Sequence, residues 1–447
     1  METNPILGFG RWIAEAPRDW PEQARDLAHR QFVDIIAVAV RGAGEEAPRL
    51  VFDAVRRWGA GPCTAIGTAK RLSAPWAALV NGTAAHVLDY DDNFDPARAH
   101  ATAVLAPAIL ALAQEEGASG AACIDAYIAG LEVMGRVGLA MNPAHRQRGW
   151  HATSTIGAIG AAAACARLLG LDAGRAAHAL SISTSMAGGS MAQFGTMTKP
   201  VHAGLAAKAG VMAAGLARSG VEGSMEALDG LKGIGRLMAE GRSFDVESIG
   251  EPLLILSHGL RVKRFSNCAS AHRAMDGLLA LMSEHGFRGN EVDEVTVRAA
   301  GSQFDNLMFS DPQDPLQAKF SLEFPLACIL ADSQCGLGNF TPDSVMRPDV
   351  RAFYPRIHRQ PYEPPAGTFL THIAVRLQDG RAVATSVLDP AGSSAAPFTW
   401  AQHWEKFNTC LAGIPAAAAI CHALEDFPAA PSIAPLMDAL SGPFGGG

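Results

Sequence analysis

The sequence contains few charged side chains, few aromatic side chains and no closely paired cysteines. Charged residues make up 18% and hydrophobic residues 49% of the 447 residues, a balance too apolar for a disordered chain. The net charge of -8 comes without any lysine- or arginine-rich stripe, so we expect no nucleic acid partner. The composition therefore predicts a compact protein with a large buried core.

Signals for disulfides, secretion and membranes are also missing. The eight cysteines form no C-x-x-C pair, and most lie in apolar stretches typical of small core residues in a reducing compartment. The first twenty residues lack the basic and apolar segments of a secretory signal. The most apolar stretch, residues 156–171, is mainly Ala and Gly and carries Arg167, which favours a buried helix over a membrane span. We expect a cytoplasmic protein with no membrane partner.

Standard cofactor and metal motifs are absent. The sequence has no H-E-x-x-H, G-x-S-x-G or P-loop, and its glycine-rich pieces do not follow a strand with the spacing of a dinucleotide site. The acidic run DYDDN (residues 89–93) begins like a calcium loop, but Phe94 and His100 occupy the positions that require glycine and glutamate. We therefore expect neither an organic cofactor nor a metal.

The pattern along the chain predicts two domains, as the length also suggests, because single cores stop growing at about 250–300 residues. Residues 21–260 are a succession of Ala/Leu-rich stretches with helix-start signals at Pro21, Ser73 and Asp172. Three stretches are apolar nearly all round, which is typical of helices surrounded by other helices. They are residues 101–113, 153–171 and 202–218.

The pattern changes after about residue 260. Residues 291–300 alternate apolar and polar, and residues 367–388 form two β-rich runs around Asp379-Gly380, a hairpin signal. Residues 315–332 between them resemble a helix. The predicted fold class is mainly α: a large discontinuous all-helical domain (1–261 and 396–447) and a smaller α+β lid domain (262–395) containing an antiparallel sheet.

Four basic residues stand where apolar helices are expected to begin: His100, His151, Lys199 and His272. Helix N-termini carry partial positive charge and unpaired N–H groups, so several converging ends would bind a polyanion. The same environment lowers the pKa of His and Lys toward values useful for proton transfer near neutrality. This arrangement predicts an acid–base site for a molecule with several carboxylates.

A structural role is the alternative at each of these positions, because a single histidine at a helix start is more often a cap or a surface residue. Lys199 is the stronger candidate, since it is the one charge in an otherwise uncharged stretch from Ala187 to Val201. Five other histidines are interpreted as structural: His178, His258, His285, His358 and His403.

Five stretches of the chain together resemble the MmgE/PrpD family, which includes 2-methylcitrate dehydratases, cis-aconitate decarboxylases and iminodisuccinate epimerases. Their order and spacing make the resemblance specific. They are NGTAAHVLDYDDNFDPARAHATAVLAPAILALA (81–113), RGWHATSTIGAIGAAAACARLLGLD (148–172), FGTMTKPVHAGLAAKAGVMAAGLARSG (194–220), VKRFSNCASAHRAMD (262–276) and AKFSLEFPLACILAD (318–332).

The resemblance implies a homodimer of large helical domains, each with a smaller α+β lid and an active site in the cleft between them. It implicates five catalytic residues, four of which the helix-start argument also selects: Asp89, His100, His151, Lys199 and His272. We expect a second group to contact the substrate: Asn93, Thr153, Thr198, Arg148 and Lys263.

Three departures from the family pattern concern the substrate. The family often has H-P-S where this chain has His100-Ala101-Thr102, and D-D-T where Asp92 is followed by Asn93. Decarboxylases of the family resemble one another in an aromatic hydroxyl near the position of Phe324, which has none. This last departure weakens, without excluding, a decarboxylase.

We expect a cofactor-independent lyase, a dehydratase or decarboxylase, acting on a small di- or tricarboxylic acid. In this hypothesis Lys199 and His151 bind carboxylates, His100 and His272 move the proton, and Asp89 orients a neighbour. Three alternatives remain. They are an epimerase of an imino-dicarboxylate such as iminodisuccinate, a non-catalytic binding protein of the same fold, and a metal-dependent hydrolase using Asp89, Asp91 and His100.

Overall fold

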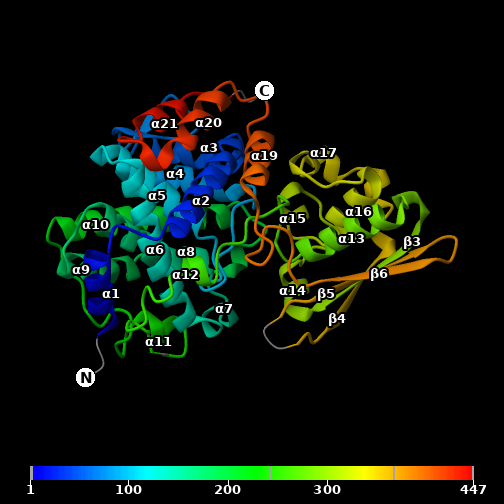
Figure 1. Cartoon of the computed structure of the whole chain (residues 1–447), viewed down its shortest axis with the longest axis horizontal. Helices are drawn as coiled ribbons and strands as arrows, with labels where there is room; N and C mark the ends of the chain where they lie inside the picture. Colours follow the sequence, from blue (N-terminus) through cyan, green and yellow to red (C-terminus); the bar gives the residue numbers. More distant parts are fainter. Residues whose placement is uncertain (1–3, 242, 366–367, 445–447) are drawn as a thin grey trace. The chain divides into compact units, whose positions relative to one another are not determined.

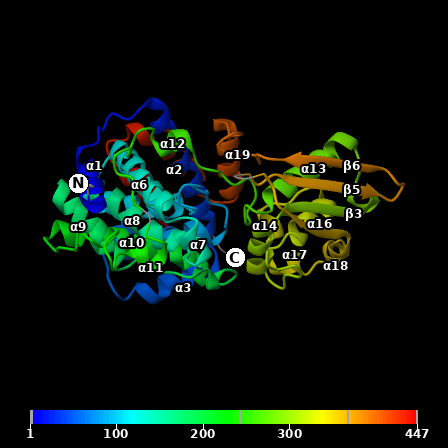
Figure 2. The same cartoon turned by 90° about the horizontal axis from the view of Figure 1, so that it is seen from below.

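The chain folds into two compact units in a computed structural model that describes residues 4–241, 243–365 and 368–444. Unit 1 comprises Met1–Val262 and Thr399–Gly447, and unit 2 comprises Lys263–Phe398. Figures 1 and 2 show that unit 1 is almost entirely helical, whereas unit 2 combines helices with a sheet. The predicted mainly α fold class is confirmed.

Unit 1 contains fifteen α-helices in its described residues, with two 3-10 turns and a two-stranded ribbon. The elements are α1 (Pro5–Glu15), α2 (Glu22–Gly42), α3 (Glu46–Val55), β1 (Cys63–Thr64), β2 (Arg71–Leu72), α4 (Ala74–Val87), α5 (Thr102–Glu116), α6 (Gly120–Met141), α7 (Ala144–Gln147), α8 (Ala152–Leu168), α9 (Ala173–Thr184), η1 (Met191–Gln193), α10 (Thr198–Arg218), α11 (Ile234–Met238), α12 (Leu254–Ser257), α19 (Trp400–Cys410), α20 (Ala417–Glu425), η5 (Phe427–Ala429) and α21 (Ala434–Ala439).

The helices begin where the sequence signals indicate. Helix α2 starts directly after Pro21, α4 after Ser73, and α9 after Asp172, whose side chain accepts the N–H of Arg175 at 2.9 Å. Helix α8 is buried from Ala152 to Arg167, as expected of a helix surrounded by other helices. In the described parts of the chain, no helix is both long and apolar enough to cross a membrane.

Helices α4 and α10 cross at a point that admits no side chain. A Cβ atom on Gly82 would lie 2.7 Å from the Cα of Gly204, and a Cβ on Gly204 would lie 2.1 Å from the carbonyl oxygen of Leu79. Glycine permits this approach of two backbones. The crossing brings the end of α4, with His86, close to the beginning of α10, with Lys199.

The two sequence segments of unit 1 pack on each other. Helix α19 lies against α2, and Figure 1 shows the red C-terminal helices beside the blue N-terminal ones. The buried ammonium of Lys406 on α19 lies 2.8 Å from the Asp34 carboxylate on α2. Burying either charge without the other would be costly. The ion pair therefore favours the packing of the two segments on each other.

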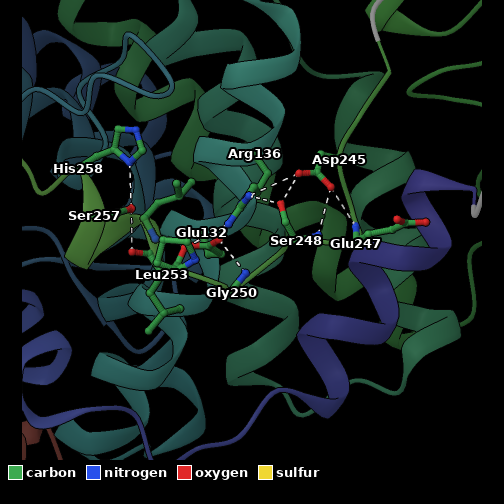
Figure 3. Close-up of polar contacts among 11 residues, drawn as sticks. Glu132, Arg136, Asp245, Glu247, Ser248, Gly250, Leu253, Ser257 and His258 are labelled. Carbon is green, nitrogen blue, oxygen red and sulfur yellow. Dashed lines mark hydrogen bonds and ion pairs between the residues drawn. The ribbon is translucent and has the colours of Figure 1, made fainter.

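Helix α6 holds the segment that leads out of unit 1 (Figure 3). The buried Glu132 carboxylate accepts the Arg136 Nε–H at 2.8 Å and the backbone N–H groups of Gly250 and Leu254 at 2.9 and 2.7 Å. Arg136 also donates to the Ser248 hydroxyl at 2.7 Å. One ion pair within a helix therefore satisfies the backbone of a loop more than a hundred residues away.

Unit 2 contains six short or medium α-helices and a four-stranded sheet in its described residues. The elements are α13 (His272–His285), η2 (Gly289–Glu291), β3 (Val292–Ala300), α14 (Gly301–Asn306), α15 (Pro315–Ala318), α16 (Glu323–Asp332), η3 (Leu337–Asn339), α17 (Pro342–Val345), α18 (Pro348–Arg351), η4 (Tyr354–Arg356), β4 (Ile357–Tyr362), β5 (Thr371–Leu377) and β6 (Ala382–Val387).

The sheet has the strand order β4-β3-β5-β6 and is mixed, which corrects the purely antiparallel expectation. The β3–β5 and β5–β6 pairs are antiparallel, and β5 and β6 form the predicted hairpin, although residue 367 lies outside the described residues. The β3–β4 pair is parallel. The helices and loops between β3 and β4 make the crossover connection that two parallel neighbouring strands require. No local sequence signal predicted β4.

The core of unit 2 lies between the sheet and helices α13 and α16. Helix α13 contacts β5 and β6 and also α16. The helix expected over residues 315–332 is interrupted between α15 and α16 at residues 319–322. Phe324 is fully buried in this core and packs against Phe340.

Candidate active site

All four basic residues lie where a helix begins. His151 is the N-cap of α8, Lys199 is the second residue of α10, His272 is the first residue of α13, and His100 precedes the first residue of α5 by two. Three of the four, His100, His151 and Lys199, belong to unit 1. Residues 89–93, called the acidic loop below, contact two of them, His100 and Lys199.

Asp89 begins the acidic loop and pairs with Lys199. The Lys199 Nζ lies 2.5 Å from Asp89 Oδ1, and both side chains are buried. The φ angle of Asp89 is 51°, the left-handed region that residues with a side chain seldom occupy. Such strain persists where the surroundings impose it. The ammonium of Lys199 also lies 5.5 Å from the ring centre of Phe194.

Three partners hold the rest of the acidic loop, one nearby in the sequence, Thr102, and two from distant parts of unit 1, Arg261 and Lys406. The Tyr90 carbonyl accepts the Lys406 Nζ–H at 2.8 Å. The Asp92 carboxyl accepts the backbone N–H of Thr102 at 3.0 Å. Asn93 exchanges two backbone hydrogen bonds with Arg261, at 2.9 and 2.8 Å. The loop is therefore a fixed platform for its carboxylates.

His100 lies between two carboxylates of this platform. Its Nδ1 is 3.2 Å from Asp91 Oδ2, and its Nε2 is 4.0 Å from Asp89 Oδ1. The same Asp91 oxygen accepts from His86 Nδ1 at 2.8 Å. The rings of His86 and His100 are 4.3 Å apart between centroids. Asp91 is thus shared by two imidazoles.

His151 forms a second imidazole pair, with His202. The two Nδ1 atoms are 2.9 Å apart, so one nitrogen carries the proton and the other accepts it. Burial, with Lys199 nearby, lowers the pKa of both His151 and His202. Burial likewise lowers the pKa of His86 to about 3. These three rings are neutral near pH 7, next to a lysine and two aspartates.

This arrangement suits acid–base work on an anion. An ammonium offers fixed positive charge, and neutral imidazoles can accept a proton or, once protonated, add positive charge. The ammonium of Lys199 already binds one carboxylate, that of Asp89. In a dry pocket such contacts are stronger than in water.

Four of the residues here are close enough together to be considered as metal ligands. One ligand atom from each of His86, Asp89, Asp91 and His100 lies within 4.8 Å of the others. The Lys199 ammonium, however, lies 2.5 Å from Asp89 Oδ1, and a fixed positive charge in the cluster repels a dication. We therefore assign no metal to these residues.

The predicted substrate-contacting residues of unit 1 lie in different settings. Thr153 is fully buried and accepts the backbone N–H of His100 at 3.1 Å. Asn93 is half-buried within the acidic loop. Thr198 is exposed beside Lys199. Arg148 is exposed and donates to the carbonyl of Ala239, the residue that follows α11, at 2.7 Å.

The two remaining predicted residues, Lys263 and His272, belong to unit 2. Both are buried. The Nε2 of His272 is 3.3 Å from the Asn267 carbonyl oxygen, and its ring packs edge-on against Phe265 with centroids 5.2 Å apart. Their participation in the chemistry stays a prediction.

Two residues of the cluster, His86 and His202, were not selected from the sequence, and Asp91 was named only in the metal-dependent alternative. His86 sits at the end of an apolar helix rather than at its beginning, so the helix-start argument excludes it. His202 follows Lys199 by three residues, a spacing that places side chains on one helix face. That spacing is the one signal that would have indicated His202.

Models of the two domains of one protein family match most of the chain. The model of the MmgE/PrpD N-terminal domain matches residues 9–247, and that of the MmgE/PrpD C-terminal domain matches residues 265–424. Among curated relatives, the chain is 31% identical to cis-aconitate decarboxylase of Homo sapiens over 325 residues, covering 69% of this chain and 67% of the relative.

Two further relatives carry the same name. The chain is 30% identical to cis-aconitate decarboxylase of Mus musculus, over 69% of this chain and 66% of that protein, so the match spans just under two thirds of the relative's length. It is 27% identical to cis-aconitate decarboxylase of Aspergillus terreus over 74% of both chains. With both family domains matched in order, the chain belongs to the MmgE/PrpD family.

Proposed function

We propose that the protein is a lyase that decarboxylates cis-aconitate or a closely similar unsaturated tricarboxylic acid by proton transfer, without a metal or organic cofactor. The observation that carries the proposal is the meeting of Lys199, His100 and His151 around the acidic loop in unit 1. The names of the relatives support the choice of decarboxylation over dehydration.

The chemistry needs stabilisation of negative charge and one proton. When carbon dioxide leaves, the electron pair of the broken carbon–carbon bond stays on the remaining skeleton and spreads toward a neighbouring carboxylate. A proton then adds to carbon and completes the product. Positive charge near the carboxylate and a positioned acid lower the barrier for these two events.

Each part of the cluster has a proposed role. Lys199, which keeps its ion pair with Asp89, binds the substrate carboxylate that takes up the charge, and His151 binds a second carboxylate. His100 delivers the proton. We retain His272 as a further proton-transfer residue because the family resemblance implies it.

Replacement of Lys199 tests this proposal. We expect Lys199→Ala to lower the kcat for cis-aconitate by on the order of 10²- to 10³-fold, because the charge that stabilises the carbanion-like state is lost. Lys208→Ala on the same helix is the matched control, since Lys208 lies over the Trp76 ring, and it should retain activity. Release of carbon dioxide with one deuterium incorporated from D2O is the measurement.

Other outcomes of the same assay identify the alternatives. Exchange of an α-hydrogen in iminodisuccinate without loss of mass would indicate an epimerase. Loss of activity on chelation, with recovery on adding zinc, would indicate the metal-dependent hydrolase. Absence of turnover and of any thermal shift with citrate, methylcitrate, aconitate, itaconate or iminodisuccinate would contradict the proposal.

A further inference from the structure

Asp91 is a fully buried carboxylate between two imidazoles. Its Oδ2 atom accepts the His86 Nδ1–H at 2.8 Å and lies 3.2 Å from His100 Nδ1. Its Oδ1 atom is buried and has no hydrogen-bond partner among the described residues. A carboxylate oxygen that is buried without a hydrogen-bond donor costs folding free energy. Such a cost is more readily explained by a function of Asp91 than by a contribution to stability.

We propose that Asp91 is a positioning residue for the proton transfer. It holds His100 through Nδ1, so that Nε2 is the nitrogen that exchanges the proton with the substrate, and His86 is a neutral donor that fixes Asp91. The role of His100 in proton transfer to a substrate rests on the proposed function. The positioning of His100 by Asp91 does not.

His86 can act only as a donor toward Asp91. Its side chain is completely buried, and burial lowers its pKa to about 3. A neutral imidazole carries one ring proton. Since an ionised carboxylate only accepts, that proton must be on Nδ1, the atom 2.8 Å from Asp91. His86 therefore fixes the carboxylate without supplying a positive charge.

Asp91 keeps its negative charge in this setting. Burial alone would raise its pKa, but the favourable electrostatic interactions and hydrogen bonds with the two imidazoles of His86 and His100 outweigh burial, and the pKa of Asp91 is lowered. An ionised carboxylate beside Nδ1 favours the tautomer of His100 with the proton on that nitrogen, and it stabilises the imidazolium when Nε2 takes up a second proton.

The contact between His100 Nδ1 and Asp91 Oδ2 is at ion-pair distance, 3.2 Å, and can shorten when substrate binds. Catalytic hydrogen bonds are often long in proteins without substrate and shorten in the complex. The backbone N–H of His100 is already held by the Thr153 hydroxyl at 3.1 Å, and its ring is tilted against the His86 ring. We expect a rotation about the Cβ–Cγ bond of His100 to align the Nδ1–H with a carboxylate oxygen of Asp91 when substrate binds.

Asp89 is the weaker candidate for this role. Its Oδ1 atom is 2.5 Å from the Lys199 ammonium but 4.0 Å from His100 Nε2, which exceeds hydrogen-bond distance. Among the residues that the structure describes, the charged and titratable groups near His100 come from the acidic loop and from helices α4, α8 and α10. They are Asp89, Asp91, His86, His151 and Lys199.

Asp91→Asn tests the inference in the whole protein without substrate. Nitrogen-15 NMR of histidine-labelled protein, with His100 assigned by its loss in His100→Gln, reports the tautomer and the pKa. We expect wild-type His100 to carry its proton on Nδ1, and the Asp91→Asn change to lower the pKa of His100 by about one pH unit or more. An unchanged pKa, or a wild-type proton on Nε2 alone, would overturn the inference.

Asp92→Asn is the matched control, because burial raises the pKa of Asp92 to about 8 and the carboxyl is already neutral near pH 7. This variant should leave the His100 pKa in place. If Asp91→Asn does not fold, His86→Gln, which removes the donor that fixes Asp91, should produce a smaller shift in the same direction.

Kinetics separate this inference from the proposed function. With cis-aconitate, Asp91→Asn should lower kcat by on the order of 10²-fold and change KM much less. The apparent pKa in kcat/KM should fall together with the NMR value. If no acid is turned over while the NMR result holds, the proposed function fails and the positioning of His100 by Asp91 stands.

Discussion

At the scale of single residues, neighbouring carboxyl groups in the acidic loop differ in charge because their partners differ. Asp91 interacts with the imidazoles of His86 and His100, and these contacts lower its pKa. Asp92 is equally buried, and burial together with the charge of Asp91 raises the pKa of Asp92 to about 8. Two adjacent aspartates are therefore an anion and a neutral acid near pH 7.

Asp92 should make the protein less stable as the pH rises. Its folded pKa of about 8 exceeds the ordinary value of 3.8, so the folded state binds this proton more tightly than the unfolded state. The contribution is fully present at low pH and is lost between about pH 4 and pH 8. Relative to Asp92→Asn, the wild type should lose up to about 1.4 kcal/mol of unfolding free energy per pH unit in that window.

Urea unfolding of both proteins at pH 5, 6, 7 and 8 measures this difference. The Asn side chain keeps an oxygen for the Thr102 N–H and cannot ionise. Unfolding free energies that change in parallel with pH in the two proteins would contradict the raised pKa.

At the scale of elements, the sequence predicted several features because their causes are local. The hairpin follows from Asp379-Gly380, where Gly380 has a φ of 89°, and the beginning of α9 follows from the side chain of Asp172. The parallel β4 strand and the interruption between α15 and α16 were not predicted. Both depend on what the segment packs against, rather than on a local signal.

The Glu132–Arg136 pair on α6 should be critical for unit 1 because both charges are buried. Glu132→Gln leaves the Arg136 guanidinium, 9% exposed, without its ion partner within the helix. We expect a loss of roughly 3–5 kcal/mol in unfolding free energy, as in other broken buried pairs. Denaturant unfolding monitored by circular dichroism measures it.

Two further variants test the cause of that loss. Asp53→Asn breaks the exposed Asp53–Arg56 pair at the end of α3 and should cost no more than about 1 kcal/mol. The double variant Glu132→Gln with Arg136→Met removes both charges, keeps an acceptor oxygen for the backbone N–H groups of Gly250 and Leu254, and should be more stable than Glu132→Gln alone. Equal losses for the buried and the exposed pair would contradict this interpretation.

At the scale of the whole molecule, unit 1 is assembled from both ends of the chain. The Lys406–Asp34 ion pair joins α19 to α2, with exposures of 3% and 2% for the two side chains. Lys406 also donates to the Tyr90 carbonyl in the acidic loop. The second segment of unit 1 therefore supports the candidate active site, as well as the hydrophobic core.

Lys406→Met should weaken this assembly, because it leaves the Asp34 carboxylate buried and unpaired. We expect a loss of roughly 3–5 kcal/mol in unfolding free energy and faster amide hydrogen exchange in α2 and α19. Arg71→Met is the matched control, since Arg71 also joins the two segments, through Asp438, but at the surface. An equal effect of both changes would contradict the role of the buried pair.

Other properties of the whole molecule remain predictions. The homodimer implied by the family resemblance can be tested by light scattering, and the cytoplasmic location by fractionation. The domain boundaries expected at residues 262 and 396 lie close to the limits of unit 2, Lys263 and Phe398.

The sequence by itself determined the helix beginnings and the family, because caps, apolar periodicity and motif order are properties of short stretches. It thereby placed His100, His151 and Lys199 near helix N-termini. Only the tertiary structure decided their partners. Lys199 meets Asp89 across 110 residues of sequence, and Asp91 meets both His86 and His100. These pairs, and the charge states that follow from them, depend on helix crossings and burial, which no local pattern encodes.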